Sequence, residues 1–125
     1  MRRLWPAIAL PLALSACGPS QEDTAAYADA VRCYNASSVY AQLFVITGQA
    51  ESAGRLMTYA KTTRARAITL GEKAGKDEKA VTAEFKENDE AYLHRFYIIS
   101  GGSMTPTGFA ASEILYCNLT RVVEQ

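Results

Sequence analysis

Histidine occurs only once in these 125 residues, and no nucleophile, base and orienting acid can be assembled around it. Metal-ligand clusters of histidine and cysteine are missing as well, and so are nucleotide-binding motifs. We therefore identify no catalytic, metal or cofactor-binding residue, and we expect a protein that is not an enzyme.

An excess of charge of either sign is also missing, because thirteen basic residues balance thirteen acidic ones. Such a chain has no electrostatic attraction for nucleic acid, so we expect no nucleic-acid partner. Proline is scarce beyond residue 19, where Pro106 stands alone, and this leaves long stretches free to be helical. A hydrophobic content of 49% in a chain of this length is typical of one globular domain.

The N-terminal region has no hydrophobic run long enough to cross a membrane. Arg2 and Arg3 precede an apolar run over residues 4–14, whereas a membrane-spanning helix needs about 20 residues. A positive start followed by a short apolar run is typical of a secretory signal peptide. We therefore assign residues 1–16 to a signal peptide.

The end of this run, Leu14-Ser15-Ala16-Cys17, resembles the lipobox of bacterial lipoproteins. The resemblance covers the leader alone, and it implies cleavage before Cys17 and acylation of that cysteine with palmitate-like chains that anchor the protein in a membrane. Gly18 differs from the aspartate that retains such proteins at the inner membrane, which implies the periplasmic face of the outer membrane. In the alternative interpretation the leader is an ordinary secretory signal and Cys17 has no role.

The number of cysteines agrees with acylation of Cys17. Of the three cysteines, Cys33 and Cys117 then remain as an even pair in an oxidising compartment. We expect them to form a disulfide that stabilises the fold by about 4 kcal/mol. The alternative is two buried thiols on separate faces.

Residues 17–23 are interpreted as the lipidated cysteine with a short polar tether, and residues 24–125 as a helical bundle domain. Side chains of the first helix recur at helical spacing, so that six of them share one face: Tyr27, Val31, Tyr34, Ser38, Ala41 and Val45. In total four amphipathic helices are expected, at residues 24–47, 52–73, 78–99 and 105–123.

Short connections between these segments predict an all-α fold, a four-helix antiparallel (up-down) bundle with one disulfide. Asp77 is the expected N-cap of the third helix, and Thr105 with Pro106 is the expected start of the fourth. A competing interpretation pairs residues 39–47 with residues 92–100 as strands, because both stretches are rich in β-branched and aromatic residues.

Three further groups of residues are weaker site candidates. His94 and Glu90 lie one helical turn apart, and a small enzyme built on them is an unfavoured alternative. The cations Lys61, Arg64 and Arg66 begin a basic stretch that we interpret as solvated surface, with docking of an anionic polymer or headgroup as the alternative. Seven tyrosines are interpreted as core residues with polar edges, although tyrosine is also common in binding surfaces.

We expect an envelope lipoprotein that binds another protein or supports an envelope assembly, through a groove that takes an amphipathic helix. A small helical lipoprotein resembles the pilotins of secretion systems, which carry a secretin subunit to the outer membrane, although this chain shares no motif with them. The alternative function is a carrier or sensor of a small apolar ligand held within the bundle.

Intact mass spectrometry of the membrane-extracted protein tests the anchor and the disulfide together. We expect a chain that begins at Cys17 and carries acyl groups, and that gains two hydrogen atoms on reduction. A mass equal to the unmodified full-length chain, or one unchanged by reductant, contradicts these assignments.

Overall fold

The computed structural model describes residues 18–125. Helices account for 77% of these residues, so the expectation of a mostly helical fold is confirmed. The elements in chain order are α2 (Gln21–Ile46), α3 (Ala50–Lys73), α4 (Glu78–Phe96), β1 (Tyr97–Ser100), β2 (Ser103–Pro106), α5 (Gly108–Tyr116) and α6 (Leu119–Val123).

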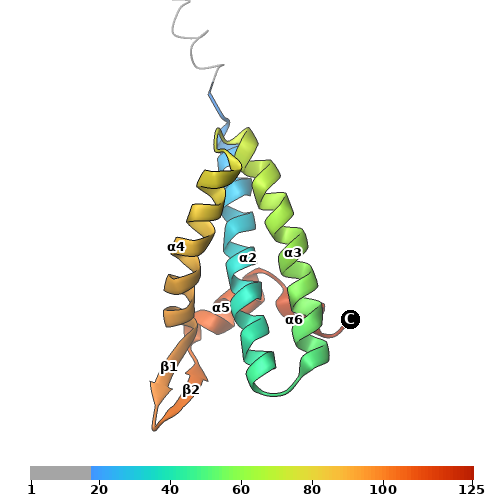
Figure 1. Ribbon diagram of the computed structural model, residues 1–125, viewed down its shortest axis with the longest axis vertical. Coiled ribbons are helices and arrows are strands. Elements are labelled where there is room, and N and C mark those ends of the chain that lie inside the picture. The colour runs from blue at the N-terminus through green and yellow to red at the C-terminus, as the bar shows by residue number, and fades with distance from the viewer. Residues whose placement is uncertain (1–17) are drawn as a thin grey trace, which may run out of the picture.

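Three long helices form the body of the molecule, with α2 between α3 and α4 (Figure 1). The chain runs along α2, returns along α3 and runs again along α4. Helices α3 and α4 meet near the start of α2 and diverge toward its end, which gives the molecule a narrow end and a wide end (Figure 1).

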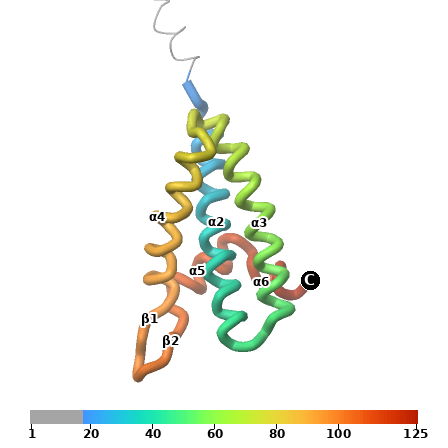
Figure 2. The backbone as a smooth tube through the Cα atoms, viewed as in Figure 1, coloured from blue at the N-terminus to red at the C-terminus, as the bar shows by residue number. Residues whose placement is uncertain are grey.

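The expected fourth long helix is not found in the described chain. Its residues form two short helices that run across the wide half of the long ones (Figure 2). Helix α5 contacts α2 and α4, and α6 contacts α3. Between them Asn118 adopts a left-handed conformation with φ of 54°, which asparagine tolerates better than most residues. The four-helix antiparallel bundle is therefore replaced by three long helices and a crossing C-terminal segment.

The start of α2 lies inside the segment that we interpreted as tether. The Ser20 hydroxyl oxygen accepts a hydrogen bond from the Asp23 backbone N–H at 3.0 Å, which caps the helix at Gln21. Residues 21–23, which we assigned to the tether, are therefore helical, and only residues 18–20 precede α2 in the described chain. Asp77 caps α4 as predicted, because its carboxylate accepts from the Ala80 N–H at 2.8 Å.

A β-hairpin occupies the segment where the third helix was expected to end and the fourth to begin. Gly101 and Gly102 have positive φ values of 58° and 85°, which close a two-residue turn between antiparallel strands β1 and β2. Pro106 lies in β2, and Thr107 caps α5 in place of Thr105. The competing strand interpretation is correct only for Tyr97–Ser100, whose partner is Ser103–Pro106.

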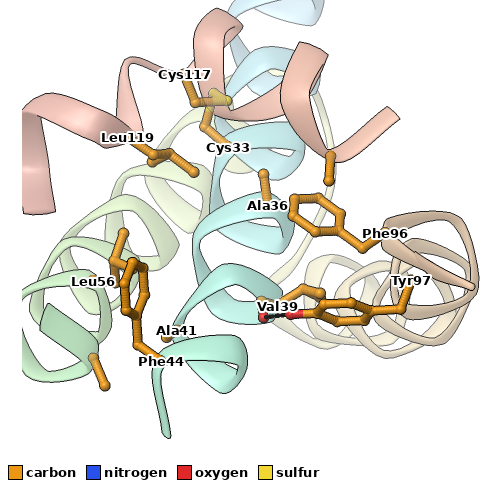
Figure 3. Close-up of a cluster of buried hydrophobic side chains, with 12 residues drawn as sticks. Cys33, Ala36, Val39, Ala41, Phe44, Leu56, Phe96, Tyr97, Cys117 and Leu119 are labelled. Carbon is orange, nitrogen blue, oxygen red and sulfur yellow. Dashed lines mark hydrogen bonds between the residues drawn. A yellow bond between two sulfur atoms is a disulfide. The ribbon is translucent and has the colours of Figure 1, made fainter. Parts of the chain in front are cut away.

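The larger core cluster fills the wide half of the molecule (Figure 3). Phe96 of α4, Leu56 of α3 and Leu119 of α6 are almost completely buried there around α2. The Tyr97 hydroxyl donates a hydrogen bond to the Val39 carbonyl oxygen at 3.0 Å, which ties the base of the hairpin to α2. The C-terminal segment is thus part of the core.

A second cluster closes the narrow end, where Tyr27 and Val31 of α2 pack with Ala67 of α3 and with Val81 and Phe85 of α4. The Tyr27 hydroxyl and the Lys76 ammonium both donate to the Glu84 carboxylate. Burial alone would raise the pKa of Glu84, but these two hydrogen bonds outweigh it and hold that pKa below its usual value.

The close contact of helices at the narrow end depends on Gly71, which is buried in α3. A Cβ atom at this position would lie 2.6 Å from Val81 Cγ2 and 3.1 Å from Tyr27 Cε1. We expect Gly71→Ala to lower the free energy of unfolding by about 1–3 kcal/mol, because the added methyl overpacks the cluster. Urea unfolding followed by circular dichroism measures this change.

Gly54 is the matched control, since it is also helical in α3 but has no atom within 4 Å of the position that an added Cβ would take. Gly54→Ala should stabilise the protein by about 0.5–1 kcal/mol through helix propensity alone. Equal effects of the two substitutions would contradict the packing described for the narrow end.

Candidate functional site

Cys17 and residues 1–16, the expected lipid site and leader, lie outside the described residues. Within residues 18–125, no helix is both long and apolar enough to cross a bilayer.

The other two cysteines are joined across α2 and α5. The sulfur atoms of Cys33 and Cys117 lie 2.12 Å apart and their Cα atoms 5.5 Å apart, which is the geometry of a disulfide (Figure 3). The two cysteines meet because α5 crosses α2. The disulfide fixes the end of α5 to the first half of α2.

An ion pair between a half-exposed arginine and a buried carboxylate holds the same two helices together. The Arg32 guanidinium of α2 donates two hydrogen bonds, of 2.8 and 2.7 Å, to the carboxylate of Glu113 on α5, which is 3% exposed. Tyr92 of α4 donates to the same carboxylate at 3.3 Å, and burial together with this carboxylate raises the pKa of Tyr92 to about 12. The Tyr116 ring lies 3.5 Å from the Arg32 guanidinium. Both carboxylate oxygens of Glu113 accept hydrogen bonds, so this side chain links α5 to α2 and α4.

The other side of α2 borders a groove that it shares with α3. We call this the α2–α3 groove, and its volume is about 400 Å³. It is lined by Tyr34, Ser38, Ala41, Gln42 and Val45 of α2 and by Met57, Ala60, Lys61 and Arg64 of α3.

Small side chains leave the α2–α3 groove hollow. Ala41 and Ala60 are buried at its floor, whereas Val45 and Met57 on its walls are 61% and 59% exposed. Exposed apolar side chains beside a concave surface are typical of a binding site, because covering them removes apolar area from water.

Cations lie at the end of the groove away from Val45. Lys61 and Arg64 have no carboxylate within salt-bridge distance among residues 18–125, where the ion pairs are Arg32–Glu113, Arg55–Glu51 and Lys76–Glu84. The Arg64 guanidinium lies 5.5 Å from the centroid of the Phe85 ring, which orients it without neutralising it. The groove therefore combines an apolar end with a positively charged end.

A smaller hollow of about 210 Å³ adjoins the groove and reaches α4. Tyr34 and Arg64 line both cavities, and Phe85, Lys86 and Asp89 border the second. Burial raises the pKa of Asp89, because the ionised carboxylate is poorly solvated there. Together the two cavities border all three long helices.

The remaining sequence candidates lie elsewhere. His94 and Glu90 are both exposed on α4. Within residues 18–125, no three histidine, cysteine, aspartate or glutamate side chains are grouped so that they could hold a metal ion. Of the basic stretch, Lys61 and Arg64 line the groove, whereas Arg66 is exposed outside it. Tyrosines contribute mainly to the core, although Tyr34 also lines the groove.

The sequence places Ser38, Ala41 and Val45 on one face of the first helix, but it does not show that part of this face is uncovered: Ala41 is buried, whereas Val45 is 61% exposed. A signal was present in the small residues Ser38 and Ala41 on α2 and Ala60 on α3, which cannot fill the space between two helices. Comparisons of the chain with protein-family models, curated proteins and solved structures find no match. The function must therefore be argued from the geometry of the groove.

Proposed function

We propose that this protein is a lipid-anchored, non-enzymatic binding protein of the bacterial envelope whose α2–α3 groove holds an amphipathic helix of a partner protein. The observation that carries the proposal is an exposed apolar groove with two cations at one end, Lys61 and Arg64, which form no salt bridge within residues 18–125. The lipobox-like sequence ending at Cys17 supports the anchor and the envelope location.

The dimensions of the groove suit a helix. From Tyr34 to Val45 the groove follows α2 for about 17 Å, which equals about three turns of a partner helix. A helix with apolar side chains every three or four residues would place them against Val45, Met57 and the alanine floor.

The two cations of the groove determine which charges we expect on the partner helix. Lys61 and Arg64 lie within one turn of each other on α3, so two carboxylates on the partner helix can reach both. Each ion pair at such an exposed rim is worth up to about 1 kcal/mol, and the attraction weakens as salt is added. The partner segment is therefore amphipathic and acidic at one end.

A helix fits the groove better than a small apolar ligand does. Sites for small ligands enclose most of the ligand surface, whereas the walls of this groove are exposed at Val45 and Met57. A helix laid along the groove would cover those walls and keep its own polar face in water.

The test uses a defined probe, which is an end-capped, alanine-rich helical peptide with leucines along one face and glutamates beside them. We expect fluorescence anisotropy to show saturable binding to the parent protein. The double substitution Lys61→Glu with Arg64→Glu should weaken binding by about tenfold or more, because two attractions become repulsions. A peptide with lysines in place of the glutamates should bind this double variant more tightly than it binds the parent protein.

Arg66→Glu with Lys73→Glu is the matched control, because both residues are exposed cations of α3 outside the groove. This variant has the same net charge as the groove variant and should bind the acidic peptide within about twofold of the parent. Equal weakening in both variants would mean that the overall charge of the protein, and not the groove, controls peptide binding. That result would contradict the groove as the binding site. If the protein bound the fatty acid laurate but neither peptide, the groove would be a site for a small amphiphile and not for a helix.

A further inference from the structure

The two ends of a helix bound in the α2–α3 groove would differ in charge and in hydrogen-bonding groups. The C-terminal end of an α-helix has four carbonyl groups without intrahelical partners and carries about half a negative charge. The N-terminal end has four unpaired N–H groups and carries about half a positive charge. The side chains at each end of the groove therefore favour one direction of the bound helix.

Cations gather at the end of the groove that lies toward the narrow end of the molecule. Tyr34 and Arg64 line this end, and both also line the smaller hollow that reaches α4 (Figure 1). Lys86 of α4 borders the hollow, and Lys61 lies one turn from Arg64 on α3. Among residues 18–125, none of these three cations lies within salt-bridge distance of a carboxylate. Three positive charges therefore surround the place where one end of a bound helix would lie.

The charged side chains at this end are mainly hydrogen-bond donors. The guanidinium of Arg64 and the ammonium groups of Lys61 and Lys86 donate hydrogen bonds and accept none. Within the described chain, Asp89 is the only carboxylate residue that lines the groove or the hollow, and its Oδ1 atom is buried. A helix end with free carbonyl groups is thus matched here, whereas one with free N–H groups meets few acceptors.

The opposite end of the groove carries no charge. Val45 of α2 and Met57 of α3 form its walls, and α2 has no charged residue from position 33 to its end at Ile46. Helices α2 and α3 run in opposite directions, so their own dipoles oppose each other and favour neither direction of a third helix (Figure 1). The cations at the Arg64 end therefore determine the direction.

We propose that the partner helix lies with its C-terminal end at Arg64 and Lys86 and with its N-terminal end near Val45, parallel to α3 and antiparallel to α2. This inference rests on the proposed function of the groove. The last turn of the partner helix would carry its acidic side chains, and its free carbonyl groups would face the cations. Such a partner is recognisable, because acidic residues usually occupy the first turn of a helix and not the last.

Two end-capped, alanine-rich peptides of identical composition test the direction. Both carry leucines along one face, but the C-acidic peptide has two glutamates in its last turn and the N-acidic peptide has them in its first turn. We expect fluorescence anisotropy to show at least about fivefold tighter binding of the C-acidic peptide at low salt, and a smaller ratio at high salt. Glutamates favour a helix N-terminus, so the N-acidic peptide should be the more helical one in isolation, and this difference opposes the expected order.

The substitution Lys86→Gln should weaken binding of the C-acidic peptide by about threefold, because Lys86 borders the hollow where the helix would end. Lys79→Gln is the matched control, since Lys79 is an exposed cation of α4 that lines neither the groove nor the hollow. This variant should bind the peptide within about 1.5-fold of the parent protein. Equal losses in the two variants would overturn the contact of the helix end with the hollow.

A nitroxide label on one end of the C-acidic peptide reports the direction itself, because it broadens nearby amide NMR signals of the protein. A label at the peptide N-terminus should broaden the signals of Val45 and Met57, and one at the C-terminus those of Arg64 and Lys86. The reverse pattern, or equal binding of the two peptides, overturns the proposed direction but leaves the groove as a helix site. A lack of saturable binding by both peptides overturns the groove itself, and the direction with it. A dimer seen by sedimentation in the parent protein, but not in the variant with Lys61→Glu and Arg64→Glu, overturns the choice of a foreign helix over a second copy.

Discussion

The attachment of α5 across one side of α2 determines the rest of this structure. Arg32 and Glu113 form a bidentate ion pair between the two helices, and the Cys33–Cys117 disulfide joins them a short distance away. Removal of Arg32 would leave the buried Glu113 carboxylate without its cation, whereas the Arg32 side chain itself is 36% exposed. With α5 and α6 held on this side, the wide half of the molecule gains its core there, and the α2–α3 groove on the other side is left uncovered.

The positions of the α2–α3 groove and of the hairpin follow from the same arrangement. The divergence of α3 and α4 makes room for α5 and α6, and the hairpin is the link through which the chain turns from α4 to α5 (Figure 1). The hairpin and the exposed end of the groove near Val45 lie toward the wide end, whereas α2 starts at the narrow end. A protein anchored near the start of α2 would thus present its apolar surfaces on the side away from the membrane.

The long helices could be predicted from the sequence, because hydrophobic spacing and capping are local. Asp77 was predicted as the cap of α4, and the mostly helical fold follows from the same patterns. The hairpin was missed because the helical period of residues 78–96 was continued through Ile98 and Ile99, although the glycine pair after Ser100 is a typical hairpin turn. The groove could not be predicted in this way. Whether Val45 faces core or solvent depends on which side of α2 is covered by α5, and that is decided by the contact of Arg32 with a residue 81 positions away.

The rate of thiol labelling at two positions of α2 tests this account most directly. Gln42→Cys places a thiol in the groove, and Ala36→Cys places one in the wide-half core, where the alanine is fully buried. If α5 and α6 cover only the side opposite the groove, a water-soluble maleimide should modify residue 42 at least about a hundredfold faster than residue 36 in the folded protein. Protection of residue 42 equal to that of residue 36 would mean that the C-terminal segment covers the groove, and it would contradict the account.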